Sequence, residues 1–249
     1  MFASQILRFD SLPSTNLEAA RLASEGAPEG VCVIAREQTA GRGRLDRRWV
    51  SPKDAGLYFS IVLRPQFRQS DWPLLTLMAA VAVHDALLEA CALEADIKWP
   101  NDLLVNEKKI SGILAETVET KTGRAVVIGI GVNLTKHSFP KALGLEATSV
   151  ETVIGQSEQL EVLLITLITA LAKYYGVLND SDGPKSIIAA WSQRSSYAEG
   201  KVVRVIESDA RFVGTTRGLE HDGALRVETS NGKIRLVRAG DVTNLRPEL

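Results

Sequence analysis

Two apolar stretches in the first quarter of the chain predict neighbouring β-strands. Residues 31–36 (VCVIAR) form an apolar run of strand length, and residues 57–63 alternate so that four large apolar side chains fall on one face. The segment between them, residues 37–56, contains three glycines and has no apolar periodicity. It is therefore predicted to be a long loop that joins the two strands.

Longer apolar patterns further along the chain predict helices around a meander of short strands. Residues 74–91 have the spacing of an amphipathic helix, with His84 and Asp85 on its polar side. Residues 158–178 and 184–191 also favour helices. Between them, strand-like segments alternate with turn formers, which predicts an antiparallel meander. These segments are residues 97–99, 103–105, 109–119 and 125–134.

After about residue 196 the strand-like segments become short, β-branched and rich in charge. Four of them follow one another, at residues 201–207, 211–219, 224–230 and 233–239. The Asn231-Gly232 step between the last two is a strong hairpin signal. This spacing predicts a small all-β barrel over residues 196–249. It follows an α+β domain over residues 1–195, whose mixed, largely antiparallel sheet is flanked by helices.

The composition is that of an ordinary soluble globular protein. Of 249 residues, 45% are hydrophobic and 24% are charged, and 29 Lys and Arg stand against 30 Asp and Glu, a formal net charge of −1. These figures exclude disordered and collagen-like chains. They also remove any argument for a globally basic nucleic-acid binder, so that functional charge has to be local.

The sequence also predicts where the protein works. Its longest stretch without a charged residue, residues 72–84, is shorter than the ~18 residues that a membrane-spanning helix needs. The N-terminal residues MFASQIL do not develop into a signal peptide. Cys32 and Cys91 lie in apolar surroundings, as buried thiols do in a reducing compartment. We expect a cytoplasmic protein without a membrane partner.

The most informative segment is residues 41–49, GRGRLDRRW. Between Arg36 and Arg48 there are five arginines and two acids, a local excess of positive charge in a nearly neutral chain. The alternating glycines allow the backbone to approach a ligand closely, and guanidinium groups match carboxylate and phosphate oxygens. The pattern favours binding of an anion by this loop over a merely solvated basic loop. A nucleic-acid patch would interleave several aromatic residues with the charge, and only Trp49 is available.

A second candidate is the turn at residues 98–102, KWPND, with Lys108 and Lys109 beyond the next turn. Proline restricts itself and the preceding tryptophan, so an amide and a carboxylate are held close together. Beside a phosphate site, Asp102 would be a suitable ligand for Mg²⁺. Read alone, the same residues also make a good structural turn.

Three glycines interrupt strand-like segments. Gly112 lies in the segment at residues 109–119. Gly129 and Gly131 alternate in the segment at residues 125–134 and leave one face of that strand bare. Such a floor allows a flat ligand or a second backbone to lie directly on the sheet; a bulge or a tight helix contact is the alternative. Asn133 lies on the same side and offers a hydrogen-bond donor and an acceptor.

Three hydrogen-bonding residues, Ser14, Thr15 and Asn16, precede a helical segment. On physical grounds they are first of all a helix N-cap. Their side chains could also close around a polar, uncharged ligand group such as a urea.

Taken together and in this order, these motifs closely resemble the biotin protein ligases. The resemblance covers the whole chain and implies a catalytic domain related to class II aminoacyl-tRNA synthetases and lipoate ligases, followed by a small SH3-like β-barrel. It implies an ATP-dependent reaction. Biotin and ATP give biotinyl-5′-AMP and pyrophosphate, and the biotinyl group then passes to a lysine of the biotin carboxyl carrier domain of acetyl-CoA carboxylase or a related carboxylase.

The resemblance also implies roles for individual residues. Lys109 would bridge the biotin carboxylate and the α-phosphate, Arg44 would act beside it, and Asp102 would help to hold Mg²⁺. The residues implied to bind biotin are Ser14, Thr15, Asn16, Gln38, Gly41, Arg42, Gly43, Arg44, Lys109, Gly112, Leu114, Gly129 and Gly131. Those implied to bind ATP are Arg44, Arg47, Trp49, Asn101, Lys109 and Asn133.

The sequence departs from the family pattern, usually Gly-Arg-Gly-Arg-x-Gly-Arg, at Asp46. We hypothesise that Asp46 weakens retention of biotinyl-AMP, either by its charge or by pairing with Arg47. Only 13 residues precede Ser14, so a DNA-binding repressor role is not expected. A monomer or weak homodimer is expected. The alternatives are a lipoate or octanoate ligase or transferase of the same superfamily and, outside enzymes, a nucleic-acid binding module.

Overall fold

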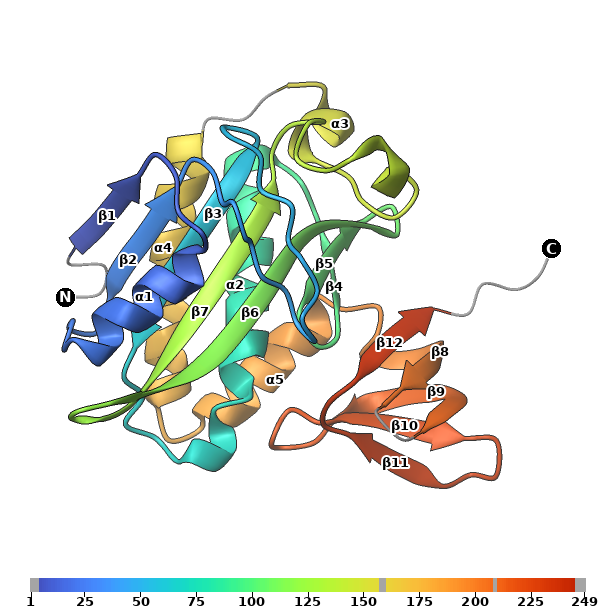
Figure 1. Ribbon diagram of the computed structural model, residues 1–249. Coiled ribbons are helices and arrows are strands. Elements are labelled where there is room, and N and C mark those ends of the chain that lie inside the picture. Colours follow the sequence, from blue (N-terminus) through green and yellow to red (C-terminus); the bar gives the residue numbers. More distant parts are fainter. Residues whose placement is uncertain (1–4, 157–159, 208–209, 245–249) are drawn as a thin grey trace.

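The computed structural model describes residues 5–156, 160–207 and 210–244, and its larger part is built on a seven-stranded sheet (Figure 1). The strand order is β1-β2-β3-β7-β6-β5-β4. β1 and β2 are parallel and the other neighbours are antiparallel. The strands are β1 (Gln5–Phe9), β2 (Val31–Ala35), β3 (Gly56–Leu63), β4 (Asp96–Lys98), β5 (Asp102–Val105), β6 (Lys108–Thr120) and β7 (Gly123–Asn133). The predicted mixed, largely antiparallel sheet is confirmed.

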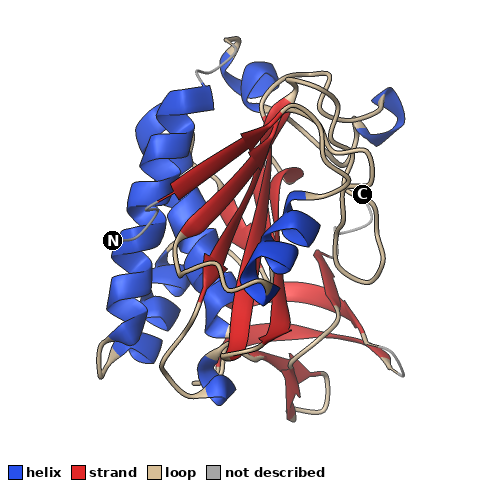
Figure 2. Cartoon of the chain, turned by 60° about the vertical axis from the view of Figure 1, so that its left-hand side comes forward, coloured by secondary structure: helices blue, strands red, loops and turns tan. Residues whose placement is uncertain are grey.

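Helices cover both faces of this sheet (Figure 2). One face carries α1 (Thr15–Ser24), which packs on β2, β3, β6 and β7 around a small cluster that includes Ala19, Val33 and Val127. The other face carries the large core. Its helices are α2 (Leu74–Cys91), α4 (Leu160–Asn179) and α5 (Gly183–Gln193). The short helix α3 (Val150–Ile154) and two 3₁₀ helices, η1 (Gln69–Asp71) and η2 (Lys141–Leu143), lie in connections.

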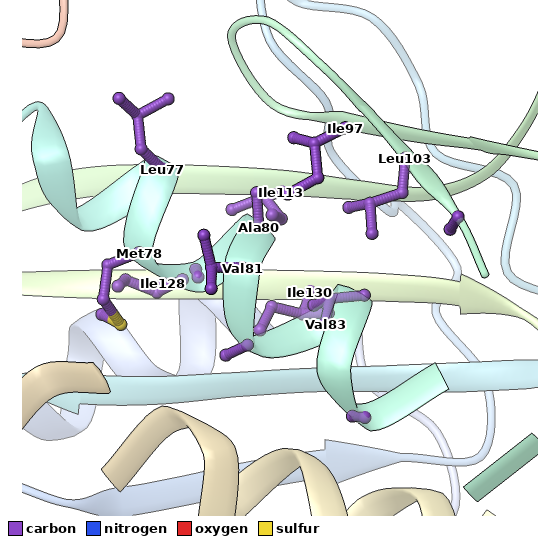
Figure 3. Packing of buried hydrophobic residues seen from close by; sticks show 14 of the residues in the cluster. Leu77, Met78, Ala80, Val81, Val83, Ile97, Leu103, Ile113, Ile128 and Ile130 are labelled. Atoms are coloured by element: carbon purple, nitrogen blue, oxygen red, sulfur yellow. The ribbon is translucent and has the colours of Figure 1, made fainter. Parts of the chain in front are cut away.

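The core is centred on α2, which is buried more completely than its pattern predicts. Figure 3 shows side chains of α2 together with those of the sheet in this cluster. The labelled residues of α2 are Leu77, Met78, Ala80, Val81 and Val83, and those of the sheet are Ile97, Leu103, Ile113, Ile128 and Ile130. His84, predicted on a polar face, is buried, with Nδ1 2.6 Å from the Ala95 carbonyl oxygen. Asp85 pairs with Arg194 at the end of α5. Because α4 and α5 cover the expected polar face, α2 is a central helix. By length and composition both α2 and α4 resemble membrane-spanning helices, but 72% of α2 is buried inside the protein.

The C-terminal part is a five-stranded antiparallel sheet in the order β11-β10-β9-β8-β12. Its strands are β8 (Glu199–Ile206), β9 (Arg211–Leu219), β10 (Leu225–Thr229), β11 (Ile234–Val237) and β12 (Asp241–Asn244). Apolar residues such as Val203, Val205 and Val227 are fully buried on its inner side. The predicted division at residues 195 and 196 falls between α5 and β8 and remains a prediction about the domain boundary.

Two strands differ from the sequence prediction. β1 was not predicted, because its Gln5, Ile6 and Arg8 are largely exposed at the edge of the sheet and form no apolar run. β12 begins at Asp241, after the last strand-like segment predicted at residues 233–239, and it pairs with β8. Residues 158 and 159, the predicted start of α4, lie outside the described residues.

Candidate functional site

Several distant parts of the chain surround a cleft on the α1 side of the large sheet. The cleft has a volume of about 140 Å³, small against the roughly 300–1,000 Å³ of typical ligand pockets. The predicted site residues that line it are Ser14, Thr15, Asn16, Gln38, Arg42, Gly43, Arg44, Arg47, Trp49, Asn101, Asp102, Lys109, Gly112, Leu114, Gly129 and Gly131. The fold therefore brings together motifs that are far apart in the sequence.

The interior glycines leave the floor of the cleft open, and two side chains lie directly on it. A Cβ atom added at Gly129 would come within 2.0 Å of Asn16 Oδ1, and one added at Gly131 within 2.5 Å of the Trp49 indole. Gly112 is opposite Gly131 in the β6–β7 register. The bare face predicted from the sequence is present, and the cleft is narrow because Asn16 and Trp49 cover its floor.

The residues from Ser14 to Asn16 begin α1, but the predicted side-chain cap is not formed. Ser14 occupies the N-cap position with an extended backbone and makes no capping hydrogen bond with its side chain. Thr15 instead donates from its backbone N–H and its hydroxyl to Gln38 Oε1, at 2.8 and 3.1 Å. Ser60 Oγ lies 2.8 Å from Thr15 Oγ1 and 2.6 Å from Asn16 Oδ1. One end of the cleft is thus a buried, uncharged hydrogen-bonding network.

Asn16 fixes this network to the sheet. Its Nδ2 donates to the Leu114 carbonyl oxygen at 3.2 Å and to Glu116 Oε2 at 2.9 Å. Glu116, which the sequence interpretation did not single out, also pairs with Arg42 at 3.0 Å. The polar end of the cleft is therefore tied to the first arginine of the charged segment.

The arginine-rich segment contains a tight hairpin rather than an irregular loop. Arg42 and Arg48 form an antiparallel bridge, and the Arg47 N–H donates to the Arg44 carbonyl oxygen at 3.1 Å. The two residues between them, Leu45 and Asp46, both have positive φ, 54° and 58°, as the central residues of a type I′ turn do. Positive φ explains why the family pattern has glycine at the position of Asp46. Aspartate tolerates positive φ better than most residues, so the turn still forms.

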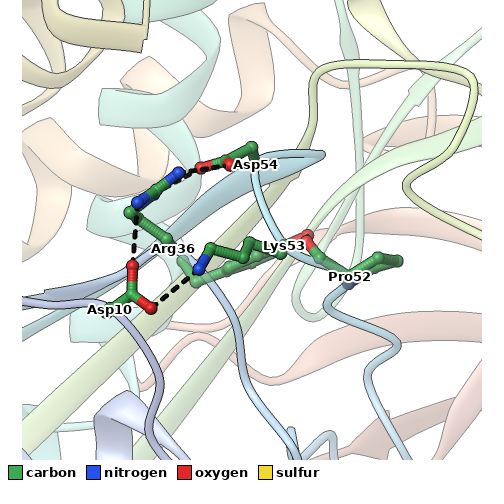
Figure 4. Close-up of polar contacts among 6 residues, drawn as sticks. Asp10, Arg36, Pro52, Lys53 and Asp54 are labelled. Atoms are coloured by element: carbon green, nitrogen blue, oxygen red, sulfur yellow. Dashed lines mark hydrogen bonds and ion pairs between the residues drawn. The ribbon is translucent and has the colours of Figure 1, made fainter.

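The base of this segment is closed outside the cleft (Figure 4). Arg36 pairs with Asp54 at 2.6 Å and with Asp10 at 2.8 Å, and Lys53 pairs with Asp10 at 2.7 Å. Part of the local excess of arginine therefore has a structural role. These groups are exposed, so each pair contributes little by itself.

Arg44 and Arg47 connect the hairpin to other parts of the molecule. Arg44 donates to Asn101 Oδ1 at 3.0 Å and to the Gly240 carbonyl oxygen at 3.2 Å. Arg47 forms an ion pair with Asp241, not with Asp46 as one form of the sequence hypothesis required. Burial lowers the pKa of the Arg44 guanidinium, whereas Asp241 and Asp102 act to raise it. Arg44 is thus a half-buried cation, and the Asn101 amide and Gly240 carbonyl oxygens that accept its hydrogen bonds are neutral, as suits an anion site.

Lys109 and Lys98 bring further positive charge to the same end. Lys109 Nζ lies 2.6 Å from Asp102 Oδ1 and 5.3 Å from the centre of the Trp49 ring. Lys98 is opposite Asp102 in the β4–β5 register. Burial lowers the pKa of the Lys98 ammonium, Asp102 opposes this shift, and Lys109 adds to it. The sequence marks Lys98 only as part of the turn motif, whereas the strand pairing makes it a neighbour of Asp102.

Two predicted residues do not line the cleft. A Cβ atom added at Gly41 would come within 2.3 Å of the Trp49 carbonyl oxygen, so glycine at this position allows the two hairpin strands to meet. Asn133 is buried and donates to the Thr148 carbonyl oxygen at 3.0 Å. The lining residues that the sequence interpretation missed are Arg48, Phe59, Ile113, Ile130 and Asp241. The apolar ones lie in predicted strands, and no local signal marks Asp241.

The carboxylates at the cleft suit a magnesium ion only in combination with a phosphate ligand. In the described parts of the chain no three His, Cys, Asp or Glu residues gather as a metal site. Mg²⁺ commonly uses one or two carboxylates together with substrate phosphates. Asp102, in a cluster of cations that would attract phosphate, fits this description.

The cleft thus has an uncharged polar end, a glycine floor and a cationic end on a mixed, largely antiparallel sheet, an arrangement that suits the binding of an anionic ligand. The chain belongs to the biotin/lipoate A/B protein ligase family, whose sequence pattern matches residues 7–133. Residues 200–243 match the biotin protein ligase C-terminal domain. The resemblance to biotin protein ligases found in the motifs is confirmed.

Relatives and solved structures extend this likeness over nearly the whole chain. A biotin--[acetyl-CoA-carboxylase] ligase of Paracoccus denitrificans is 38% identical, over 92% of this chain and 96% of the relative. The bifunctional ligase/repressor BirA of Bacillus subtilis is 36% identical, over 97% of this chain and 74% of the relative. The structure of the biotin protein ligase from Aquifex aeolicus in complex with biotin and ATP is 26% identical, with a TM-score of 0.84, over 98% and 100% of the two chains.

Proposed function

We propose that this enzyme is an ATP-dependent biotin protein ligase that activates biotin as biotinyl-5′-AMP and transfers it to a lysine of a biotin carboxyl carrier domain of acetyl-CoA carboxylase or a related carboxylase. The observation that carries the proposal is the arrangement of the cleft. A buried network of neutral donors and acceptors lies at one end, and Arg44 and Lys109 lie at the other, across a glycine floor. Lys98 is opposite Asp102 on the neighbouring strand. A ligand with an uncharged polar head, an apolar body and a carboxylate matches this order of groups.

In the first step, a biotin carboxylate oxygen attacks the α-phosphorus of ATP and pyrophosphate leaves. The two reacting groups are both anions and repel each other, so fixed cations at the point of contact lower the barrier. We assign this role to Lys109 and Arg44. Arg44 is held by Asn101, and Lys109 by Asp102, so neither cation has to be ordered at the moment of reaction.

In the second step, the neutral amine of the acceptor lysine attacks the biotinyl carbonyl carbon. An amide forms, AMP leaves, and the amine loses a proton to solvent water. The same cations balance the charge on the departing phosphate. No side chain is assigned as the proton acceptor. The carboxylates of Asp102, Glu116 and Asp241 are already paired with cationic side chains.

Binding roles follow from position. Ser14, Thr15, Asn16 and Gln38 would hydrogen-bond the ring end of biotin, and Gly112, Leu114, Gly129 and Gly131 would lie along its apolar part. Trp49, Asn101 and Arg47 would contact ATP. Asn133 is the last residue of β7, beyond Gly131, and would act on ATP only through the strand end that it orders. Mg²⁺, when bound beside Asp102, would neutralise charge on the phosphates.

The partners follow from the same chemistry. Biotin, ATP and a biotin carrier domain are the expected ligands. We infer that the reaction takes place in the cytoplasm, without nucleic acid or membrane, and that the enzyme is a monomer or weak homodimer. The relatives named above as ligases support the reaction, and the buried thiols of Cys32 and Cys91 suit a reducing compartment.

Mass measurement of the acceptor tests the proposal. The protein is mixed with ATP, Mg²⁺ and a biotin carrier domain, and either biotin or lipoate is supplied. The expected result is a mass increase of one biotinyl group with biotin and none with lipoate. An increase only with lipoate would replace the proposal by a lipoate ligase, and no increase with either would refute it.

A further inference from the structure

Residues 240 and 241 of the C-terminal sheet reach into the cleft of the larger part of the molecule. Asp241 forms an ion pair with Arg47, and the Gly240 carbonyl oxygen accepts a hydrogen bond from Arg44 at 3.2 Å. Asp241 also lines the cleft itself. The C-terminal sheet therefore contributes directly to the surroundings of the arginine hairpin.

The position of Asp241 is fixed by its own sheet. It is the first residue of β12, where it pairs with Ile206, and the next residue, Val242, is fully buried. Gly240 has a φ of +136°, and a Cβ there would come within 2.6 Å of the Ile206 carbonyl oxygen. The Asp241 side chain is 24% exposed, against 63% for Arg47. A firmly held carboxylate thus meets a more exposed arginine.

The C-terminal sheet is also attached to the turn that holds the other side of Arg44. The Trp99 indole N–H donates to the Gly223 carbonyl oxygen at 3.1 Å. Two residues further on, Asn101 accepts from Arg44 and donates to the Ile113 carbonyl oxygen at 2.9 Å. Arg44 is therefore held between the Trp99–Asn101 turn and Gly240, and these two supports are themselves joined.

These contacts explain why a carboxylate is present at an anion site. An unpaired Asp241 would repel the phosphates of ATP, but its ion pair with Arg47 neutralises it and leaves Arg44 and Lys109 to act on the anions. The benefit is geometric, because a hairpin held at both Arg44 and Arg47 stays over the reacting groups. Without that support the hairpin is held mainly through Arg42 and its base.

We propose that Asp241 is a positioning residue that holds the arginine hairpin closed over the activated intermediate, so that the C-terminal sheet keeps biotinyl-AMP in the cleft until the acceptor arrives. This inference rests on the proposed function. Asp241 pairs with Arg47, and the contacts with the reacting groups are assigned to Lys109 and Arg44. Its loss is expected to change how long the intermediate is retained more than how well biotin binds.

The test measures free biotinyl-AMP released by the whole protein supplied with biotin, ATP and Mg²⁺ but no acceptor. Asp241→Asn is expected to increase release about tenfold, the usual scale of one hydrogen bond to a charged group, with the KM for biotin unchanged within about twofold. Asp241→Glu is expected to restore part of the retention. The matched control is Glu207→Gln, which removes a carboxylate that pairs with Arg235 within the C-terminal sheet, and should release as little as the wild type.

A double variant separates positioning from a general structural effect. If Asp241 acts through Arg47, adding Asp241→Ala to Arg47→Ala should not increase release beyond that of Arg47→Ala alone. Additive effects, or wild-type retention in Asp241→Asn, would overturn the inference while leaving the proposed function intact. If the wild type makes no biotinyl-AMP at all, the proposed function fails instead. Asp241→Asn keeps the shape of the side chain, so it remains informative if Asp241→Ala does not fold.

Discussion

Lys109 Nζ and Asp102 Oδ1 lie 2.6 Å apart across neighbouring strands, and this ion pair is at the centre of the cationic end of the cleft. Both side chains are partly shielded, with 32% and 20% of their surface exposed. The pair orients Lys109 and keeps its charge compensated until an anionic ligand competes for it. Its neighbour Lys108 turns the other way and donates to the Gly144 carbonyl oxygen at 2.9 Å.

Replacement of Lys109 should abolish most activity, whereas replacement of its neighbour Lys108 should have little effect. Lys109→Ala is expected to lower the rate of acceptor biotinylation at least about 100-fold, because it removes an electrostatic contact of the transition state. Lys108→Ala is the matched control and should stay within about twofold of the wild type. Initial rates of biotin transfer check both. Equal losses in the two variants would show that Lys109 acts through the structure of the strand.

The glycine floor should not accept a methyl group where Asn16 crosses it. Gly129→Ala would place a Cβ within 2.0 Å of Asn16 Oδ1, so Asn16 has to move and the KM for biotin should rise at least about tenfold. Gly176, on the exposed side of α4, has no atom within 4 Å of such a Cβ. Gly176→Ala should leave KM unchanged and raise the free energy of unfolding by about 0.5–1 kcal/mol. Enzyme kinetics and urea unfolding measure the two effects, and an unchanged KM in Gly129→Ala would contradict the assigned biotin position.

Asp46 allows the charge and the backbone at the hairpin turn to be tested separately. Its φ of 58° costs a residue with a side chain roughly 1–2 kcal/mol, less for Asp than for most. Asp46→Gly relieves this cost and should slow release of biotinyl-AMP about threefold to fivefold. Asp46→Asn removes the charge alone and should change release little, because Arg47 pairs with Asp241. If Asn matches Gly, charge is the cause; if neither differs from the wild type, the hypothesis about Asp46 fails.

Lys98 should serve ATP more than biotin. Among the described residues no acidic side chain forms an ion pair with it, and burial lowers the pKa of its ammonium, so a nearby phosphate would stabilise its charged form. Lys98→Ala is expected to raise the KM for ATP about tenfold, with the KM for biotin within about twofold. The exposed Lys185, on α5, provides the control Lys185→Ala. Equal increases in both KM values for Lys98→Ala would indicate damage to the turn rather than a lost phosphate contact.

Much of the fold could be predicted because its elements carry their own signals. β2 and β3 are apolar runs, and the interior glycines of β7 mark the floor of the cleft. β1 could not be predicted because it is an exposed edge strand that is stabilised by pairing with β2 rather than by an apolar pattern. The polar face expected for α2 was misjudged, because a single helix does not show that α4 and α5 will cover His84.

The site residues also divide into those with a local sequence signal and those without one. Residues within a motif could be proposed together, and the fold places nearly all of them around one cleft. The partners of the arginines could not be proposed, because charge alone does not specify which acid it meets. Glu116 lies 74 residues from Arg42 and Asp241 lies 194 residues from Arg47. Only the three-dimensional arrangement joins them, and Asp241 comes from the other part of the molecule.

The central claim is that the cleft activates a carboxylate by adenylation, and the product formed without an acceptor tests it most directly. The protein is incubated with biotin, ATP and Mg²⁺ alone, and the bound and free nucleotides are identified by mass spectrometry. We expect biotinyl-5′-AMP held by the protein together with one equivalent of pyrophosphate, and almost none of either with Lys109→Ala. Formation of ADP and phosphate, or ATP left unchanged, would contradict it.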